Sequence, residues 1–198
     1  MRKLNGYLLP CILTVLVAAG CTPGTGGAAV TAPLAQNSAA TTSAEIRFKV
    51  PEGWITEKPS SSMRVAQYKL PKVEGDSADA SLVLYFFGSG QGGTISDNID
   101  RWINQIKQTD GSSSKEKAKT EKLTVNGLQV TTVDVSGTYT AEMAPGSQER
   151  HNDANQRLRG AVIETPKGNY YLKLIGPAKT VSHWDDSVTS YIKSIEFK

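Results

Sequence analysis

The amino-acid sequence predicts an α+β fold in which a mainly antiparallel β-sheet carries two packed amphipathic helices. Three observations support this prediction. Apolar and polar residues alternate in several short segments, the pair Asn126-Gly127 separates two strand-like segments, and two further segments change to a helical period. The elements follow one another in the order strands, helix, strands, helix.

Three strand-like segments come first. The alternation in residues 45–50 ends at the turn 51–54, and the alternation in residues 63–70 ends before Pro71. Residues 80–87 form a more continuous apolar run, which is typical of a strand buried on both faces. We therefore expect the third strand to lie nearer the centre of the sheet and the second to lie nearer an edge.

A helix is expected to begin at Thr94. Thr94 and Asp97 have the spacing of a capping box, which satisfies the free N–H groups of a first helical turn. Five large apolar side chains then recur on one helical face: Ile95, Ile99, Trp102, Ile103 and Ile106. The polar run of residues 110–114 is expected to end this helix.

Two strand pairs follow the helix. The pair Asn126-Gly127 is the strongest short hairpin signal in the chain, and its strands are expected over residues 117–125 and 128–138. The second pair is expected over residues 158–164 and 170–175, on either side of a Pro-Lys-Gly-Asn turn.

The remaining segments are a long loop, a helix and a last strand. Residues 139–157 contain Pro145-Gly146, several charges and little apolar bulk, so a long loop is expected there. A second amphipathic helix is predicted from apolar residues at helical spacing: Val181, Trp184, Val188 and Tyr191 or Ile192. Residues 194–197 are expected to return as a short strand.

The N-terminal region resembles the signal peptide of bacterial lipoproteins. Arg2 and Lys3 precede the apolar run 8–17, and small residues then lead to Cys21, as in a lipobox. The run is too short to span a bilayer, so residues 1–20 are expected to be a removed signal. The resemblance implies that Cys21 carries a diacylglycerol and an amide-linked acyl chain such as palmitate, and that it begins the mature protein.

A tether and one globular domain are expected after the signal. Residues 21–43 hold the lipidated cysteine and a run of Thr, Gly, Ala, Ser and Pro that cannot offset its own ordering entropy. A coil of that length reaches on the order of 25 Å, enough to clear the lipid headgroups. Residues 44–198 form the domain. Thr22 after the cysteine favours the periplasmic side of the outer membrane, if the organism has two membranes.

Composition excludes several classes of function. Of the formal net charge of +3, Arg2 and Lys3 contribute two, so the rest of the chain is almost neutral and a poor candidate for nucleic-acid binding. Both cysteines, Cys11 and Cys21, lie in the leader and at the lipid site. The domain therefore has no thiol for a disulfide, a metal site or a nucleophile.

Residues 88–93 have the GxGxxG spelling of a dinucleotide-binding loop, between a strand and a helix. That fingerprint also needs a parallel βαβ unit and an acidic residue at a following strand end, and the sequence predicts neither. We expect a flexible connection. The alternative is an anion at the helix start, where free N–H groups and the helix dipole favour negative charge. Its residues would be Gly88, Gly90, Gly92, Gly93 and Thr94, with Asn98 and Arg101 nearby.

No catalytic, cofactor or metal constellation is predicted. The chain has only two histidines, His151 in a solvated loop and His183 on the last helix, and it lacks the common hydrolase, kinase and P-loop motifs. The acids Glu74, Asp76 and Asp79 are expected to form a polar turn in preference to a calcium site. We therefore expect a protein that is not an enzyme.

The remaining candidate functional residues are the three tryptophans and the long loop. Trp54, Trp102 and Trp184 are expected in the core, because Trp102 and Trp184 lie on apolar helical stripes and Trp54 follows a strand-ending turn. The loop 139–157 is a candidate interaction segment, since long loops on a rigid scaffold often carry function. An idle insertion is the alternative.

Three features together resemble a known fold group. They are residues 48–54, with the sequence Phe-Lys-Val-Pro-Glu-Gly-Trp, the amphipathic helix after the third strand, and the closing strand 194–197. They are similar to the PsbP-like or Mog-like proteins, a group that includes DcrB-type bacterial lipoproteins. Over residues 45–198 this resemblance implies a curved antiparallel sheet in an α/β/α sandwich. Members of the group act mostly as binding or assembly factors, and they share no catalytic residue that transfers to this chain.

Two functional hypotheses follow. The first is a membrane-tethered, non-enzymatic domain of the bacterial cell envelope that binds a protein or envelope component through a loop or a sheet surface. The alternative is a domain that binds a small molecule or an anion, or is catalytic, through residues 88–93.

Overall fold

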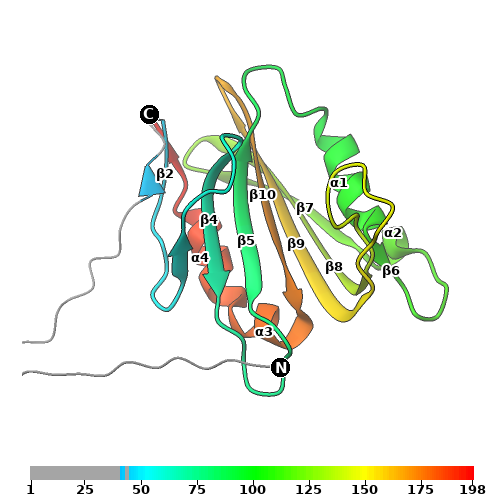
Figure 1. Ribbon diagram of the computed structural model, residues 1–198. Helices are drawn as coiled ribbons and strands as arrows, with labels where there is room; N and C mark the ends of the chain where they lie inside the picture. The colour runs from blue at the N-terminus through cyan, green and yellow to red at the C-terminus, as the bar shows by residue number, and fades with distance from the viewer. Residues whose placement is uncertain (1–40, 43–44) are drawn as a thin grey trace, which may run out of the picture. The chain divides into compact units, whose positions relative to one another are not determined.

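The computed structural model describes residues 41–42 and 45–198 (Figure 1). The predicted signal, the predicted lipidation site Cys21 and most of the predicted tether lie outside these residues. Within them the chain forms an α+β fold with a mainly antiparallel sheet and helices on both of its faces, as the sequence predicts. No helix among the described residues is long and apolar enough to cross a membrane.

One large sheet contains eight strands, and all of its neighbouring strands are antiparallel. From one edge the order is β3 (Ile55–Glu57), β4 (Arg64–Leu70), β5 (Ala80–Phe86), β10 (Gly168–Pro177), β9 (Asp153–Thr165), β8 (Leu128–Tyr139) and β6 (Ile106–Lys107), while β7 (Lys119–Val125) also pairs with β8. The predicted placing of the second strand near an edge and the third nearer the centre is confirmed. A separate three-stranded sheet joins β1 (Thr41–Thr42), β2 (Ile46–Phe48) and β11 (Glu196–Phe197).

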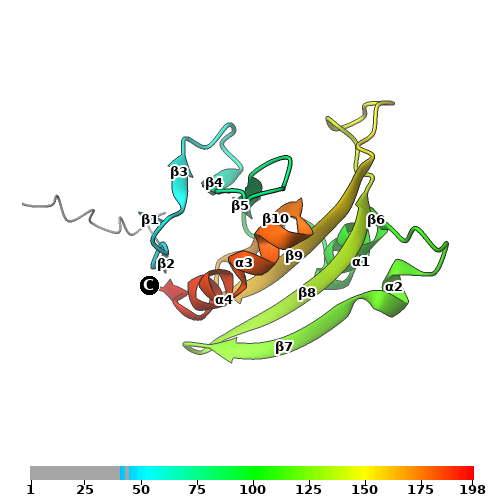
Figure 2. The same ribbon diagram turned by 90° about the horizontal axis from the view of Figure 1, so that it is seen from below.

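Helices α3 (Ala178–His183) and α4 (Asp185–Lys193) cover one face of the large sheet, as Figure 2 shows. Their core includes an aromatic cluster in which Phe48 and Tyr191 stack with ring centroids 4.5 Å apart, and Trp54 packs against Tyr191 at 5.1 Å. Burial and the neighbouring Tyr68 raise the pKa of Tyr191 well above its usual value, so this core keeps its hydroxyl neutral.

The prediction of a single continuous second helix is wrong, because the chain breaks at Trp184. This residue leaves helical geometry at φ −92° and ψ 9°, where it joins α3 to α4. Its indole N–H donates to the carbonyl of Pro71 at 2.9 Å, a bond to a distant part of the chain. A β-carbon on Gly53 would lie only 2.7 Å from the Trp184 ring, so the turn after β2 also closes on this side chain.

Helix α1 (Ile95–Asn104) lies on the opposite face, where it packs on β8 and β9. Thr94 caps it by accepting a hydrogen bond from the Asp97 N–H at 3.1 Å, as the sequence predicts. The predicted C-terminal end near residue 110 is wrong, because Ile106 already belongs to β6 and pairs with Tyr139 of β8. This long-range pairing replaces the last predicted turn of the helix, and α2 (Ser114–Lys117) follows instead of an irregular run.

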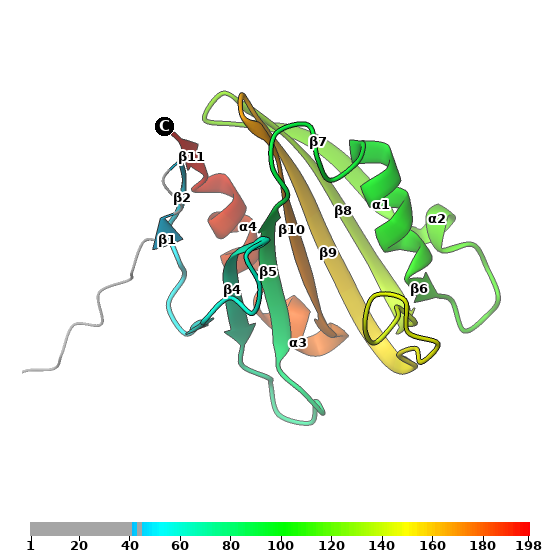
Figure 3. The ribbon, with the colours of Figure 1, turned by 45° about the horizontal axis from the view of Figure 1, so that its top comes forward.

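The hairpin at Asn126-Gly127 is confirmed. Both residues have positive φ, 48° and 85°, and β7 and β8 pair on either side of them. The predicted loop 139–157 is too long, because β8 extends to Tyr139 and β9 begins at Asp153, with a bulge in their pairing. The connection is residues 140–152, hereafter the β8–β9 loop, drawn in yellow next to α1 in Figure 3.

Candidate ligand-binding cleft

A cleft of about 830 Å³ opens beside α1. Its floor comes from β5 and β10 and its walls from α1 and the β8–β9 loop, on the face of the sheet opposite α3 and α4. The volume is within the range of small-molecule sites, about 300–1,000 Å³. Among the described residues we therefore take this cleft as the candidate functional site.

Successive side chains of β10 point to opposite faces of the sheet, so only every second one reaches the floor of the cleft. Tyr170, Leu172 and Leu174 belong to the core under α4, whereas Tyr171 and Lys173 line the cleft. Lys173 thus puts a charged group into a strand that is otherwise mostly apolar. Tyr85 of β5 also lines the floor, and Tyr171 pairs with it across the sheet.

Lys173 is held by neutral groups. Its ammonium donates to Gln105 Oε1 at 2.6 Å and to the Tyr139 hydroxyl at 3.0 Å, and it lies 5.0 Å from the centroid of the Tyr139 ring. No carboxylate of residues 41–42 or 45–198 forms an ion pair with it. Burial, and then the charge of Arg101, lower the pKa of Lys173 to about 8. The side chain is therefore mostly charged at neutral pH.

Tyr139 ends β8 at the edge of the cleft. Burial, followed by Tyr85 and Asp153, raises the pKa of Tyr139 to about 12, so its hydroxyl stays protonated. A neutral phenol can accept a hydrogen bond from the Lys173 ammonium, but it offers no negative charge. On its other side the ring packs against His151 of the β8–β9 loop, with centroids 4.9 Å apart.

Arg101 supplies a second cation from α1. Its guanidinium donates to Asn98 Oδ1, and no carboxylate in the described part of the chain pairs with it. Asn98 is 1% exposed and donates through its amide to the carbonyl oxygens of Gly92 at 2.7 Å and Thr94 at 2.8 Å. Asn98 thus fixes the glycine-rich connection to the helix and orients Arg101.

The carboxylates around the cleft are engaged elsewhere or exposed. Glu142 pairs with Arg150 at 3.7 Å within the β8–β9 loop. Asp100 pairs with Lys115 of α2 at 3.0 Å. Asp97 lies exposed in the first turn of α1, where it complements the helix dipole. These three carboxylates and Arg150 also line the cleft, but within the described residues none of the three forms an ion pair with Lys173 or Arg101.

The β8–β9 loop forms the outer wall of the cleft. An isolated bridge joins Glu142 and Arg150, and the Arg150 Nε–H donates to the carbonyl of Thr140 at 2.8 Å. Met143 projects from the loop with 59% of its surface exposed and also lines the cleft. The wall therefore combines an ordered backbone with an exposed apolar side chain.

The glycine-rich connection 88–93 lies next to the cleft without lining it. The Tyr171 hydroxyl donates to the carbonyl of Gly93 at 3.0 Å, and a β-carbon on Gly92 would lie 2.7 Å from the Tyr171 ring. These glycines thus permit close approach of the backbone to a tyrosine. Nothing in the structure tests the proposed anion at Gly88, Gly90, Gly92, Gly93 and Thr94. The carbonyl oxygens of residues 91, 92 and 93 accept hydrogen bonds from Tyr171 or Asn98.

The other candidates from the sequence lie apart from the cleft floor. Asp76 accepts hydrogen bonds from the Thr180 N–H at 2.9 Å and hydroxyl at 2.6 Å, and Asp79 accepts from the Lys72 N–H at 2.9 Å. These contacts match the predicted polar turn. His151 contacts Asp153 at 2.9 Å, and His183 is exposed against Trp184. In residues 41–42 and 45–198 no three His, Cys, Asp or Glu side chains cluster as metal ligands would.

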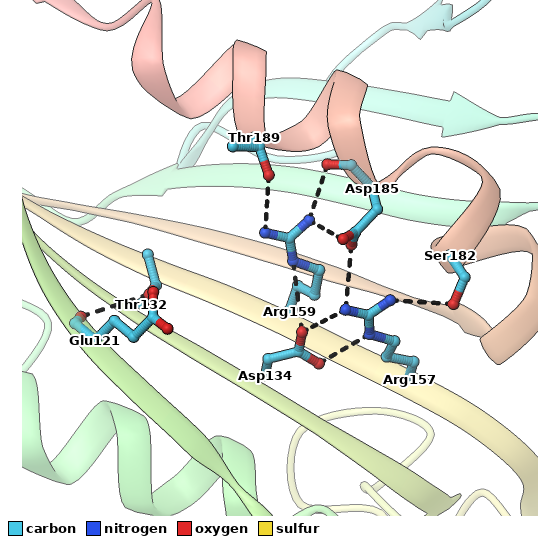
Figure 4. Close-up of polar contacts among 8 residues, drawn as sticks. All are labelled: Glu121, Thr132, Asp134, Arg157, Arg159, Ser182, Asp185 and Thr189. Carbon is cyan, nitrogen blue, oxygen red and sulfur yellow. Dashed lines mark hydrogen bonds and ion pairs between the residues drawn. The ribbon is translucent and has the colours of Figure 1, made fainter.

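An ionic network lies on the face of the sheet covered by α3 and α4 (Figure 4). Arg157 of β9 donates through Nε to Asp134 Oδ1 at 2.9 Å and contacts Asp185 at 3.2 Å, and Arg159 donates to Asp185 at 2.7 Å. The hydrogen bonds that Arg157 donates to Asp134 raise the pKa of Arg157. The two arginines and two aspartates have no net charge between them. The cluster therefore links α4 to the sheet and has no unpaired charge that would bind a ligand.

Sequence reasoning placed one cleft residue, Arg101, and its support, Asn98, near a ligand. It missed Lys173. It named the loop 139–157, which begins at Tyr139, as a candidate interaction segment, and part of that segment lines the cleft. A signal for Lys173 was present, since a lysine interrupts the otherwise apolar and aromatic segment 170–175. Trp54 and Trp102 are buried as predicted, and Trp184 is only half-buried.

The fold and the cleft define an α+β domain with a concave site of ligand size. Among the solved structures that are similar to it, PA94, a protein of unknown function from Pseudomonas aeruginosa, has 15% identity and a TM-score of 0.42, over 65% of this chain and 78% of its own. PsbP (CyanoP) from Synechocystis has 14% identity and a TM-score of 0.46, over 77% of this chain and 86% of its own. A PsbP is thus among the similar structures, in line with the sequence resemblance. At such scores neither likeness carries an argument about the cleft. No protein-family model and no curated protein sequence matches the chain.

Proposed function

We propose that this chain is a lipoprotein of the bacterial envelope, anchored through Cys21, whose domain binds a ligand or partner segment in the cleft without transforming it. The observation that carries the proposal is Lys173, a charged side chain on the cleft floor that is held only by Gln105 and Tyr139. Clefts of this size with a few convergent polar groups are the usual form of binding sites.

The contacts of Lys173 favour binding over catalysis. A lysine that acts as nucleophile or base must be neutral, whereas about nine tenths of a group with a pKa of about 8 is charged at pH 7. Gln105 Oε1 accepts a hydrogen bond but takes no proton at neutral pH, and the Tyr139 hydroxyl keeps its own, since the pKa of Tyr139 is raised to about 12. With a pKa of about 8, Lys173 serves at neutral pH as a fixed positive charge.

Site-specific photo-crosslinking in cells tests the binding role. A photoreactive amino acid would replace Met143 on the wall of the cleft, in the full-length chain. The matched control is Ile55 on β3, another exposed apolar residue, with 50% of its surface exposed, on a strand separated from β5 by β4. We expect a discrete adduct at Met143 that is absent at Ile55. Equal adducts at both positions, or none at Met143, would contradict the proposal.

The anchor has its own test. A Cys21→Ser variant loses the sulfur that accepts the lipid, so we expect the processed protein to leave the membrane fraction. A variant that stays with membranes after signal processing would refute the lipid anchor and leave the binding role untouched.

A further inference from the structure

Three positive side chains line the cleft, and one of them, Arg150, pairs with Glu142. The other two are Arg101, which is exposed, and Lys173, which is half-buried. Arg101 comes from α1 and Lys173 from β10, and the charge of Arg101 contributes to the lowered pKa of Lys173, so the two cations act on each other. Like charges that share a site destabilise it unless an opposite charge offsets them. Within the described residues, no carboxylate forms an ion pair with either side chain.

The half-buried position of Lys173 makes this arrangement informative. An ammonium that is partly removed from water is destabilised unless an opposite charge offsets the lost hydration. The partners that it has, Gln105 and Tyr139, satisfy hydrogen bonds without neutralising charge. An anion bound between Lys173 and Arg101 would give both side chains a charged partner.

The rest of the cleft floor is aromatic. Tyr85 and Phe87 are half-buried and their rings are nearly parallel, with centroids 5.9 Å apart and an interplanar angle of 5°. Both line the cleft, and Met143 lines its outer wall. Aromatic faces and a flexible thioether together suit an apolar or aromatic group.

We infer that the cleft binds a small organic anion, with its acidic group between Lys173 and Arg101 and its aromatic or apolar body against Tyr85 and Phe87. The inference rests on the proposed function and adds the chemical class of the ligand.

Calorimetry on the full-length chain at pH 7 tests this inference with a matched pair of compounds. The probes are 3-phenylpropionate and its neutral amide, 3-phenylpropanamide, which differ in charge but hardly in shape. Phenyl phosphate is a third arm that distinguishes a phosphate from a carboxylate ligand. We expect at least tenfold tighter binding of one of the acids than of the amide, equivalent to about 1.4 kcal/mol.

Three variants assign the charge preference to the cleft. Lys173→Met removes the charge at similar length and should abolish the preference for the acid while leaving the weak affinity for the amide unchanged. Lys173→Arg keeps the charge and should retain the preference. Lys193→Met removes an exposed lysine of α4, on the other face of the sheet, and should change nothing. Circular dichroism of each variant checks that it is folded.

The outcomes separate this inference from the proposed function. If the amide binds as tightly as the acids, or if Lys173→Met keeps the preference, the anion inference is overturned and binding in the cleft stands. If none of the three compounds binds while the Met143 probe still captures an adduct in cells, the ligand class is again wrong and the binding role survives. If nothing binds and no adduct forms, both are refuted.

Discussion

The protonation of Lys173 should make the stability of the domain rise with pH. The pKa of this side chain falls from 10.5 to about 8 in the folded protein, because burial and then Arg101 disfavour its charged form. Between these two pKa values the unfolded chain binds more protons than the folded chain, so the free energy of unfolding increases with pH. The penalty is fully present below pH 8 and is relieved as the pH rises towards 10.5.

The size of the effect follows from the two pKa values. From pH 7 to pH 9.5 the lowered pKa adds about 2 kcal/mol to the free energy of unfolding. The raised pKa values of Tyr139 and Tyr191 act in the opposite direction, but only above about pH 10, where an unfolded tyrosine begins to ionise. Below pH 9.5 the lysine should therefore dominate the difference between the native protein and a variant without it.

The assay is urea unfolding of the native protein and of Lys173→Met at several pH values from 7 to 9.5. The two proteins share their other titrating groups, so the difference between their unfolding free energies isolates the lysine. We expect the native protein to gain about 2 kcal/mol on the variant across this range. The Lys193→Met variant should show a constant difference from the native protein. A difference for Lys173→Met that stays constant within about 0.5 kcal/mol would refute the lowered pKa of a half-buried lysine without an ion pair.

Three further substitutions, the first with a matched control, test the fold by thermal or urea unfolding. Asp134→Ala should lower the free energy of unfolding by about 2 kcal/mol, because it removes a partner of two arginines in the ionic network. The control Asp100→Ala breaks an exposed ion pair and should lower it by less than about 0.5 kcal/mol. Equal effects would contradict the structural role of the network. Gly160→Ala should cost about 2 kcal/mol or more, since the new β-carbon would lie 2.4 Å from the Trp102 ring, and a neutral result would mean that α1 does not pack there as described. Gly127→Ala should cost about 1 kcal/mol through its positive φ of 85° alone, because the space around it is open, and a stabilised variant would argue against the turn.

Local rules predicted those parts of the fold that local chemistry determines. The cap at Thr94 and the turn at Asn126-Gly127 depend on residues next to one another, and both are present in the structure. The prediction of a helix end was wrong where a distant strand pairs with the same stretch of backbone. Ile106 continues the apolar period of α1, yet it pairs with Tyr139, far along the chain, so periodicity alone could not place the end of the helix.

The candidate site was predictable only in part for the same reason. Arg101 and Asn98 were placed near a ligand because they follow the glycine-rich connection, and that proximity in sequence is real. Lys173 and Tyr139 belong to different strands, and their contact exists only because β9 lies between β8 and β10 in the sheet. A lysine in an apolar strand segment is a local signal of an unusual environment, but the sequence does not say which residues surround it.

The unequal cover of the two sheet faces accounts for the position of the cleft. A helix of 10 residues such as α1 is about 15 Å long, and it packs on β8 and β9. The floor side chains of β5 and β10 on that face are therefore left to be enclosed by the β8–β9 loop, whereas α3 and α4 together cover the opposite face. A short helix thus leaves part of a sheet open, and the one charged side chain of β10 lies in that opening. If the cleft had only a structural role, an apolar residue at position 173 would serve it at lower cost, and the stability of Lys173→Met as a function of pH measures that cost directly.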